Sequence, residues 1–183
     1  MRSSKEQVEQ NRERLLDAAS AGYRREGFEG VRVADVMQEV GLTHGGFYAY
    51  FASKDDMAAQ AFTHHFGVLA ERLRARVERG DALGEYAESY LSRANRDHPD
   101  KSCLFPSLSG EVARQPEAVR HAYTQGLEAY LAEFTAMAGG RTEAIGAFAT
   151  LVGAMALARA VNDDALSREI LEAGKAALRA IEP

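Results

Sequence analysis

The stretch Arg32–Lys54, RVADVMQEVGLTHGGFYAYFASK, decides the fold of this chain. Its first apolar residues have the i, i+3, i+4, i+7 spacing of an amphipathic helix, namely Val33, Val36, Met37 and Val40. Gly41 follows at a position where helices often end in a left-handed residue. Thr43 is predicted to cap a second, short helix over about 43–49 with its hydroxyl. The stretch therefore predicts a helix-turn-helix, which places a few residues in a DNA major groove.

The second, short helix has one face suited to packing and one suited to DNA. Phe47 and Phe51 are four residues apart and anchor it to the core, which leaves the others outward: Thr43, His44, Gly45, Gly46 and Tyr48. His44 can donate or accept at a base edge, and the two glycines allow close approach of the backbone. The hydroxyls of Tyr48 and Tyr50 suit phosphate oxygens, as does Lys54 at the start of the next helix. A helix used only for packing is the alternative, but outward tyrosines and glycines pack poorly.

At these residues the chain resembles the TetR family of bacterial transcriptional regulators. The resemblance rests on GGFYAYFASK at 45–54, on LLDAA at 15–19 and on Gly27-Phe28, and it covers roughly residues 10–66. It implies backbone contacts from Tyr48, Tyr50 and Lys54, and base contacts from residues 43–46. Two positions depart from the family pattern. Arg32 replaces a capping Thr or Ser and adds a cation to the DNA-binding candidates, and Gly22 replaces a large apolar residue, which predicts looser packing of the first helix.

Length, charge and cysteine content narrow the class of protein. The chain has 183 residues, no tryptophan and four prolines, and its net charge is −5. Residues 1–54 hold eight basic and eight acidic side chains, so the acidic excess lies after the helix-turn-helix. The sequence contains no run of 18 apolar residues, so no membrane span is predicted. It also has no apolar segment near the N-terminus, so no secretory signal is predicted. The single cysteine, Cys103, suits a reducing cytoplasm, where we expect the protein to act.

The remainder of the chain is predicted to be helical, which makes the fold class all-α. Helices are expected over about 10–26, 53–79, 85–96, 106–114, 116–138, 142–161 and 166–181, with Ser53 as an N-cap. No segment has the alternating period of a strand. We expect two domains, a DNA-binding head over residues 1–51 and a helical domain over residues 52–183 that binds an effector and dimerises.

The helix expected over 142–161 is small and apolar nearly all round, which is typical of a helix buried on more than one side. With the helix over 166–181 it could form half of a two-fold four-helix interface. The resemblance implies the same, because the family dimerises through its last two helices. A helix buried centrally in a monomer is the alternative.

Aromatic and sulfur-containing side chains collect in the second domain and suggest a small-molecule cavity. The effector-binding candidates are Phe62, Phe66, Tyr90, Cys103, Phe105 and Tyr123. For each residue alone, an ordinary place in the core is the alternative, and the resemblance is what favours a cavity. Cys103 is either a thiol activated at a helix N-terminus or a small buried hydrophobic residue, and we favour the second.

These observations predict a non-enzymatic, homodimeric regulator without a metal or cofactor. No nucleophile–base pair, phosphate loop or metal-ligand spacing is present in the sequence. The partners expected are double-stranded DNA with a palindromic operator, a small apolar or aromatic effector, and a second copy of the chain. We interpret the protein as a repressor. An activator, a regulator without an effector, and a helical ligand-binding protein or enzyme with a vestigial head remain as alternatives.

Overall fold

The structure, a computed structural model, describes residues 5–180 and is helical throughout this range. Its elements are α1 (Lys5–Gly30), α2 (Val33–Glu39), η1 (His44–Ala49), α3 (Lys54–Arg79), α4 (Leu83–Tyr90), α5 (Arg93–Asp97), η2 (Pro99–Lys101), α6 (Phe105–Val112), α7 (Glu117–Ala138), α8 (Arg141–Ala160) and α9 (Asp164–Arg179). The all-α prediction is confirmed. The outer ends of the two predicted domains, residues 1–4 and 181–183, lie outside the described range.

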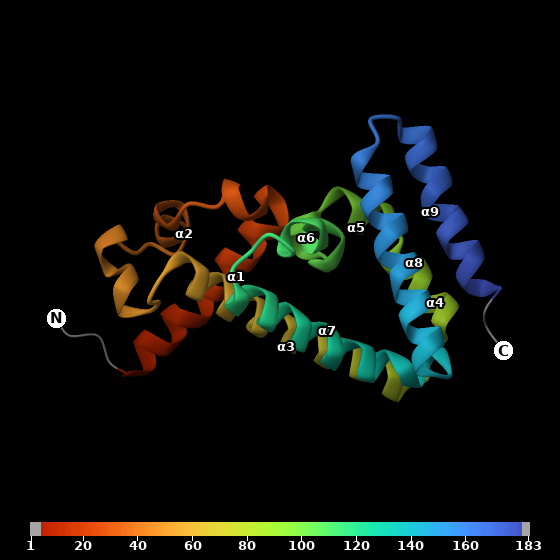
Figure 1. Ribbon diagram of the computed structural model, residues 1–183, viewed down its shortest axis with the longest axis horizontal. Coiled ribbons are helices and arrows are strands. Elements are labelled where there is room, and N and C mark those ends of the chain that lie inside the picture. The colour runs from red at the N-terminus through yellow and green to blue at the C-terminus, as the bar shows by residue number, and fades with distance from the viewer. Residues whose placement is uncertain (1–4, 181–183) are drawn as a thin grey trace.

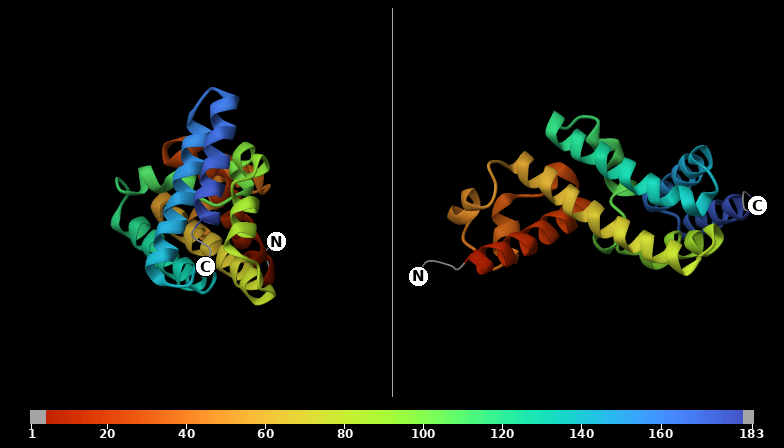
Figure 2. Two further views of the ribbon diagram at one scale, coloured as in Figure 1. Left: turned by 90° about the vertical axis from the view of Figure 1, so that its right-hand side faces the viewer. Right: turned by 90° about the horizontal axis from the view of Figure 1, so that it is seen from below.

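The two longest body helices set the shape of the molecule. Helices α3 and α7 run side by side along its length and form its most extensive helix pair (Figures 1 and 2). At one end α3 packs against α1, next to α2 and η1, and at the other α8 and α9 pack against each other and against α7 and α4. At 1.5 Å per residue, α3 is about 39 Å long. It therefore connects the helix-turn-helix to the opposite end of the body.

The helix-turn-helix forms for the reasons that its sequence suggests. Val36, Met37 and Val40 are buried, and Gly41 is left-handed with φ 78°. The predicted N-cap of α3 is also confirmed, because Ser53 Oγ accepts from the Asp56 amide at 3.0 Å. The Asp56 carboxylate in turn accepts from the Ala52 amide at 2.8 Å. One amide of the first turn and the amide that precedes the N-cap are thereby satisfied.

Several local predictions were wrong. The short second helix is a 3-10 helix, and the Thr43 side chain does not cap it. In this tighter turn the backbone carbonyl of Thr43 accepts from the Gly46 amide at 3.0 Å, so the hydroxyl is not needed. The helix predicted over 85–96 is divided into α4 and α5, because Ser92 accepts from the Asn95 amide and starts a new helix. Helix α1 starts earlier than predicted, at Lys5, and a kink at Gly27, where φ is 72°, interrupts it directly after the predicted end at residue 26.

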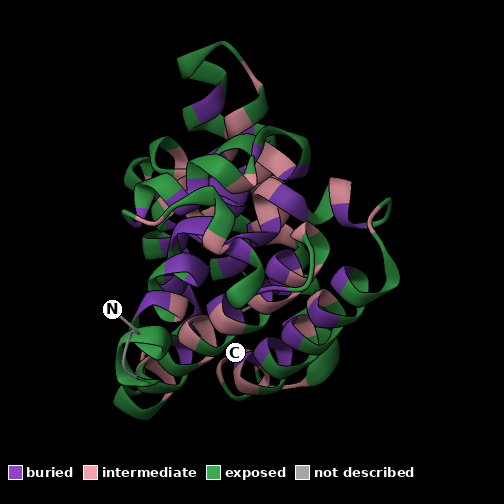
Figure 3. Ribbon diagram, turned by 90° about the vertical axis from the view of Figure 1, so that its left-hand side faces the viewer, coloured by how far each residue is buried: buried purple, intermediate pink, exposed green. Residues whose placement is uncertain are grey.

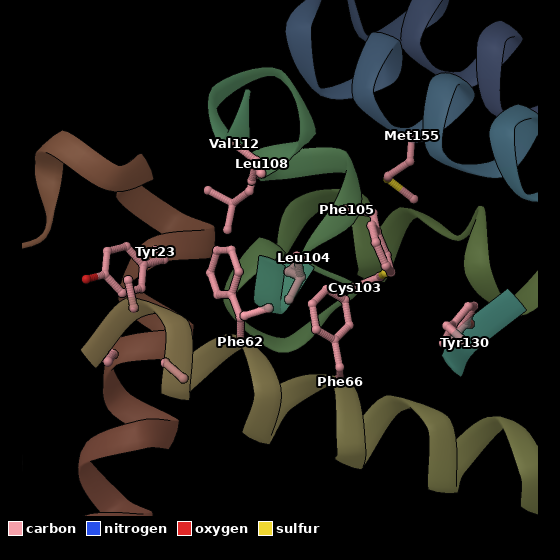
Figure 4. Close-up of a cluster of buried hydrophobic side chains, with 14 of the residues drawn as sticks. Tyr23, Phe62, Phe66, Cys103, Leu104, Phe105, Leu108, Val112, Tyr130 and Met155 are labelled. Atoms are coloured by element: carbon pink, nitrogen blue, oxygen red, sulfur yellow. The ribbon is translucent and has the colours of Figure 1, made fainter. Parts of the chain in front are cut away.

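One hydrophobic core runs through both predicted domains. Tyr23 and Phe28 of α1 contact Phe62 of α3, with ring centroids 6.1 and 5.5 Å from it, and Phe62 continues the cluster to Phe66 (Figure 4). Figure 3 shows the buried residues on the inward faces of the helices at this end. The packing expected to be loose at Gly22 is filled by Val31, whose Cγ2 would lie 3.3 Å from an added Cβ. The head and the body are therefore one packed unit, and the division at residue 51 remains a prediction about roles.

Helix α8 needs separate comment because of its composition. By length and apolarity alone, Arg141–Ala160 could cross a membrane, although the sequence predicted no span. Core helices of soluble proteins pass the same test, and 39% of this segment is buried inside the structure. Its contacts with α7 and α9 identify it as a packed body helix.

Candidate functional site

The short helix η1 presents the predicted base-reading residues outward. Phe47 is 3% exposed and fixes η1 to the core, whereas Tyr48 beside it is 78% exposed. Thr43, His44 and Gly45 are exposed as well, and nothing lies within 4 Å of a Cβ built at Gly45. Gly46 is half-buried, over the Met37 side chain. Three of the four predicted base-reading residues are therefore exposed, together with Tyr48, which was predicted to contact phosphate.

Three of the four predicted cationic or hydroxyl contacts have partners within the head. Lys54 Nζ donates to the Phe28 carbonyl at 2.8 Å, and the half-buried Tyr50 hydroxyl accepts from Asn11 Nδ2 at 3.3 Å. Arg32 Nε pairs with Asp35 at 2.9 Å on the surface. An ammonium has three donors and an exposed ion pair contributes little, so these partners leave donors of Lys54 and Arg32 for a further contact. The sequence did not reveal these partners, since Asn11 and Phe28 are distant along the chain.

The six predicted effector-binding residues separate into three groups. Phe62 and Phe66 are core residues, 0% and 4% exposed (Figure 4). Tyr90 and Cys103 line one cavity, and Phe105 and Tyr123 line another. Phe66 packs against Phe105 and Tyr123, with ring centroids 5.0 and 5.9 Å apart, so the candidates share one aromatic cluster. Phe62 and Phe66 line neither cavity, and for these two the alternative of an ordinary place in the core describes the structure.

The first cavity has a volume of about 130 Å³ and lies among α3, α4, α7 and the segment after η2. Its lining consists of Leu69, Arg72, Leu73, Arg76, Tyr86, Ser89, Tyr90, Asn95, Lys101, Ser102, Cys103 and Tyr130. Sequence reasoning missed its basic residues. The available signal was the spacing of Arg72 and Arg76, which are one helical turn apart and flank the apolar stripe at Leu69 and Leu73.

The second cavity has a volume of about 190 Å³ and lies among α6, α7 and α8. It is lined almost entirely by apolar atoms, from Phe105, Ser109, Tyr123, Leu127, Leu131, Ile145, Phe148, Ala149 and Val152. The hydroxyls of Ser109 and Tyr123 bond to each other at 2.6 Å. This space suits a neutral apolar molecule, whereas the first suits a polar one.

Cys103 is one of the residues that line the first cavity, and its thiol lies next to the Tyr90 hydroxyl. Burial raises the pKa of its thiol, which therefore stays protonated at neutral pH. A thiol activated by a helix N-terminus would have a lowered pKa. The arrangement agrees with a small buried side chain.

Two arginines, the buried Arg24 and the half-buried Arg159, hold the segment that borders the first cavity. Arg24 of α1 donates to the carbonyls of Pro99 and Asp100, with Nε at 3.2 and 3.1 Å. Arg159 of α8 donates to the Asn95 carbonyl and the Ser102 hydroxyl, both at 2.6 Å. Neither has an ion pair with a carboxylate among residues 5–180. The segment 95–102 is therefore fixed between the head and the last helix pair by hydrogen bonds to its backbone.

His65 of α3 completes the junction with α1. Its Nδ1 lies 2.9 Å from Arg24 Nη1, so the imidazole accepts and must be neutral. Burial and the charges of Arg24 and Arg72 lower the pKa of His65 to about 3. Burial also lowers the pKa of Arg24 to about 10, which leaves it charged at neutral pH. Within residues 5–180 no group of three potential metal-ligating side chains is found.

An all-helical chain with an exposed helix-turn-helix at one end of a long bundle has the architecture of a DNA-binding regulator. Residues 15–61 match the family described as bacterial regulatory proteins, tetR family. The chain is 25% identical over 126 residues to the HTH-type transcriptional repressor NemR of Escherichia coli K12, and this alignment covers 66% of the chain and 63% of the relative. It thus spans less than two thirds of that relative. Over 54 residues, 30% of this chain and 26% of the relative, it is 37% identical to an uncharacterized HTH-type transcriptional regulator, YfiR, of Bacillus subtilis.

Solved structures share the fold over nearly the whole chain. The reduced form of E. coli NemR superposes with a TM-score of 0.77 at 22% identity, covering 94% of this chain and 97% of that one. A TetR-family regulator from Cytophaga hutchinsonii has a TM-score of 0.76 at 21% identity, covering 100% and 98%. Through its helix-turn-helix segment, residues 15–61, the chain belongs to the TetR family of bacterial regulatory proteins. This is a family of regulators and not of enzymes.

Proposed function

We propose that the protein is a cytoplasmic repressor that binds a palindromic operator as a homodimer and releases it when a small molecule binds the body. The observation that carries the proposal is the open surface of η1, where Tyr48 is 78% exposed beside buried Phe47. Tyr48 lies on the second helix of the helix-turn-helix, the element that enters the major groove in proteins with this motif. The E. coli relative is named as a repressor, which favours repression over activation.

On this proposal, Thr43, His44 and Gly45 read base edges, with Gly46 giving the backbone room. Tyr48, Tyr50, Lys54 and Arg32 contact phosphates. Because residues 1–54 carry no net charge, affinity depends on placed contacts more than on a general positive field. Two heads related by a two-fold axis would meet half-sites one helical turn, or a multiple of it, apart.

The direct test selects binding sites from a pool of random DNA and measures affinity for the selected site against salt concentration. Replacing Lys54 by Gln should weaken binding to all sequences and reduce the salt slope by about 0.9 for each phosphate that Lys54 neutralises. Arg120→Gln, on the exposed side of α7, is the matched control and should change neither. If Lys54→Gln kept the parent slope, its phosphate contact would be wrong. Selection of no DNA at all would indicate a vestigial head.

The homodimer is proposed to form through α8 and α9. Five large apolar side chains are exposed among the described residues, and three of them, Ile145, Leu157 and Leu166, belong to these two helices. Gly146 and Gly153 on α8 have nothing within 4 Å of a built Cβ. An open face of this kind allows a second pair of helices to approach closely.

Sedimentation velocity tests the interface. Gly153→Arg places a long charged side chain on this face and should give monomers that bind half-sites weakly. Gly67→Arg adds the same side chain at an exposed glycine of α3 with equally open surroundings and should remain dimeric. A dimeric Gly153→Arg variant with parent affinity would exclude this face.

Effector control is proposed to act through α3 and through the Arg24 contacts. Lys54 lies at the first residue of α3, and Arg72 and Arg76 farther along it line the first cavity. A ligand that shifts α3 or the segment 95–102 would change the position of the head. Its effect cannot exceed its differential affinity for the two states, commonly about 1–3 kcal/mol. A small-molecule panel tested for release of the selected DNA decides whether there is an effector.

A further inference from the structure

The first cavity joins an aromatic interior to a basic rim. Tyr86, Tyr90 and Tyr130 form the interior, and Arg72, Arg76 and Lys101 are the charged members of the lining. No carboxylate is among the lining residues that the structure describes. The interior of the cavity therefore suits an aromatic ring, and its rim suits an anion.

Two of the three cations have no carboxylate partner. Arg76 is engaged, at 3.4 Å from Asp81 Oδ2 and 2.8 Å from Ser89 Oγ, and it lies over the Tyr86 ring. Arg72 and Lys101 are exposed, and over residues 5–180 neither is within ion-pair distance of a carboxylate. They approach the cavity from different elements, α3 and η2. An anion at the rim would therefore give Arg72 and Lys101 the negatively charged partner that each of them lacks among the described residues.

A buried hydroxyl inside the cavity also lacks a good partner. Tyr90 is 6% exposed, and no hydrogen bond satisfies its hydroxyl among the described residues. It faces the Cys103 thiol, which is a weak hydrogen-bonding group. Tyr86 and Tyr130 bond to each other through their hydroxyls and so do not serve Tyr90. A buried hydroxyl left in this state costs stability that a ligand's polar atom would recover.

We propose that this cavity binds a small molecule made of one aromatic ring and a carboxylate. The ring lies among Tyr86, Tyr90 and Tyr130, and the carboxylate meets Arg72 and Lys101. The volume of about 130 Å³ is near that of a cavity known to hold benzene, about 150 Å³. The proposal rests on the proposed function only where it makes this molecule the effector.

A ligand held by Lys101 is one residue away from the head's anchor. Asp100, whose carbonyl accepts from Arg24 of α1, directly precedes Lys101. Movement of Lys101 toward a carboxylate would therefore displace the backbone that positions α1. This gives the anion a route to the DNA-binding head.

Calorimetry with benzoate, at constant ionic strength, tests the ligand class. Benzyl alcohol keeps the ring without the charge, and acetate keeps the charge without the ring. We expect saturable binding of benzoate, with both comparison molecules at least tenfold weaker. Equal binding of benzyl alcohol, or no saturable binding of benzoate, would overturn the proposal.

Variants test the location. Arg72→Gln and Lys101→Gln should each weaken benzoate binding about tenfold, as expected for loss of a charged hydrogen bond. Arg74→Gln is the matched control, because Arg74 is on the same helix but pairs with Glu133. Ala149→Trp obstructs the second cavity and should leave benzoate binding unchanged. Loss of binding in Ala149→Trp with parent affinity in Arg72→Gln would place the ligand in the second cavity and overturn the proposal.

The role of the ligand is measured separately on the selected DNA. Release of DNA by benzoate from the parent, and about tenfold more benzoate needed by Arg72→Gln, would support both the site and its effector role. Calorimetric binding without release would support the site and contradict effector control in the proposed function. A chain that selects no DNA but binds benzoate would contradict the proposed function and leave the site supported.

Discussion

Glycine has opposite uses in η1 and in the seam between α3 and α7. At Gly45 nothing lies within 4 Å of a built Cβ, so the missing side chain leaves room for another molecule. At Gly126 a Cβ would overlap the ring of Phe66, so the missing side chain leaves room for a neighbour in the same chain. The two cannot be told apart from residue type or helical pattern. The position of the surrounding side chains decides which glycine serves packing and which serves binding.

The largest expected effect is a loss of stability from a substitution in the seam between α3 and α7. Gly126→Ala forces the Phe66 ring against Phe105 and Tyr123, whose centroids are 5.0 and 5.9 Å away. Overpacking of this kind costs about 3 kcal/mol in the free energy of unfolding. Urea denaturation of the purified variant measures it.

The matched control for the seam is Gly67→Ala, one residue beyond Phe66. It is exposed, with nothing within 4 Å of a built Cβ. Alanine there should stabilise the helix by about 0.5–1 kcal/mol. Equal effects of the two substitutions would contradict the role of Gly126 in seating Phe66.

An intermediate effect on stability is expected when the pH is lowered, because His65 at the junction between head and body is held neutral. His65 has a pKa of about 3 in the folded chain and 6.5 as its ordinary value. Between these values the unfolded chain binds the extra proton, so stability is lost as pH falls below about 6.5. At pH 5.5 this loss is about 1.4 kcal/mol relative to pH 7.5.

His65→Gln isolates this contribution, because glutamine keeps an acceptor for Arg24 and does not titrate. Denaturation at pH 7.5 and 5.5 should show a smaller loss in the variant than in the parent. His64→Gln, whose imidazole is more exposed and contacts Asp17, is the control. Identical pH dependence in parent and His65→Gln would mean that His65 is not held neutral by its surroundings.

The smallest effect on stability is expected in η1. Gly45→Ala adds a methyl group in open space and should change the free energy of unfolding by no more than about 0.5 kcal/mol. Its affinity for the selected DNA should nevertheless fall, because the methyl group occupies the space left for a base edge. Paired denaturation and mobility-shift measurements check both. Parent affinity in this variant would remove Gly45 from the proposed contact surface.

Local signals predicted the elements that depend on local physics. The apolar stripe of α2, the left-handed Gly41 and the Ser53 cap are each determined within a few residues. The bounds of α3 followed from the same signals. The 3-10 geometry of η1 and the break at Ser92 were not predicted, because backbone hydrogen bonding there competes closely with a regular helix.

The candidate sites were predictable only in part, for a different reason. The outward residues of η1 follow from the positions of Phe47 and Phe51, which are close in sequence. The hydrogen-bond partners of Lys54 and Tyr50 within the head are 26 and 39 residues away along the chain, so no local sequence pattern predicts them. The cavities depend on how α3, α4, α6, α7 and α8 meet, so aromatic content alone could not show which residues of the cluster line a cavity.

The contacts of Arg24 also set an order of events during protein synthesis. Its carbonyl partners lie 75 and 76 residues later in the chain, and Glu111, which accepts from the Phe28 amide, lies 83 residues after Phe28. At translation rates of about 5–20 residues per second, these partners follow α1 out of the ribosome by roughly 4–17 s. In the later part of that interval a nascent chain carries the whole helix-turn-helix but not yet the residues that contact Arg24 and Phe28 of α1. The helix-turn-helix end of the protein is thus synthesised first, but the contacts that fix α1 there form only after residues 99–111 have been synthesised.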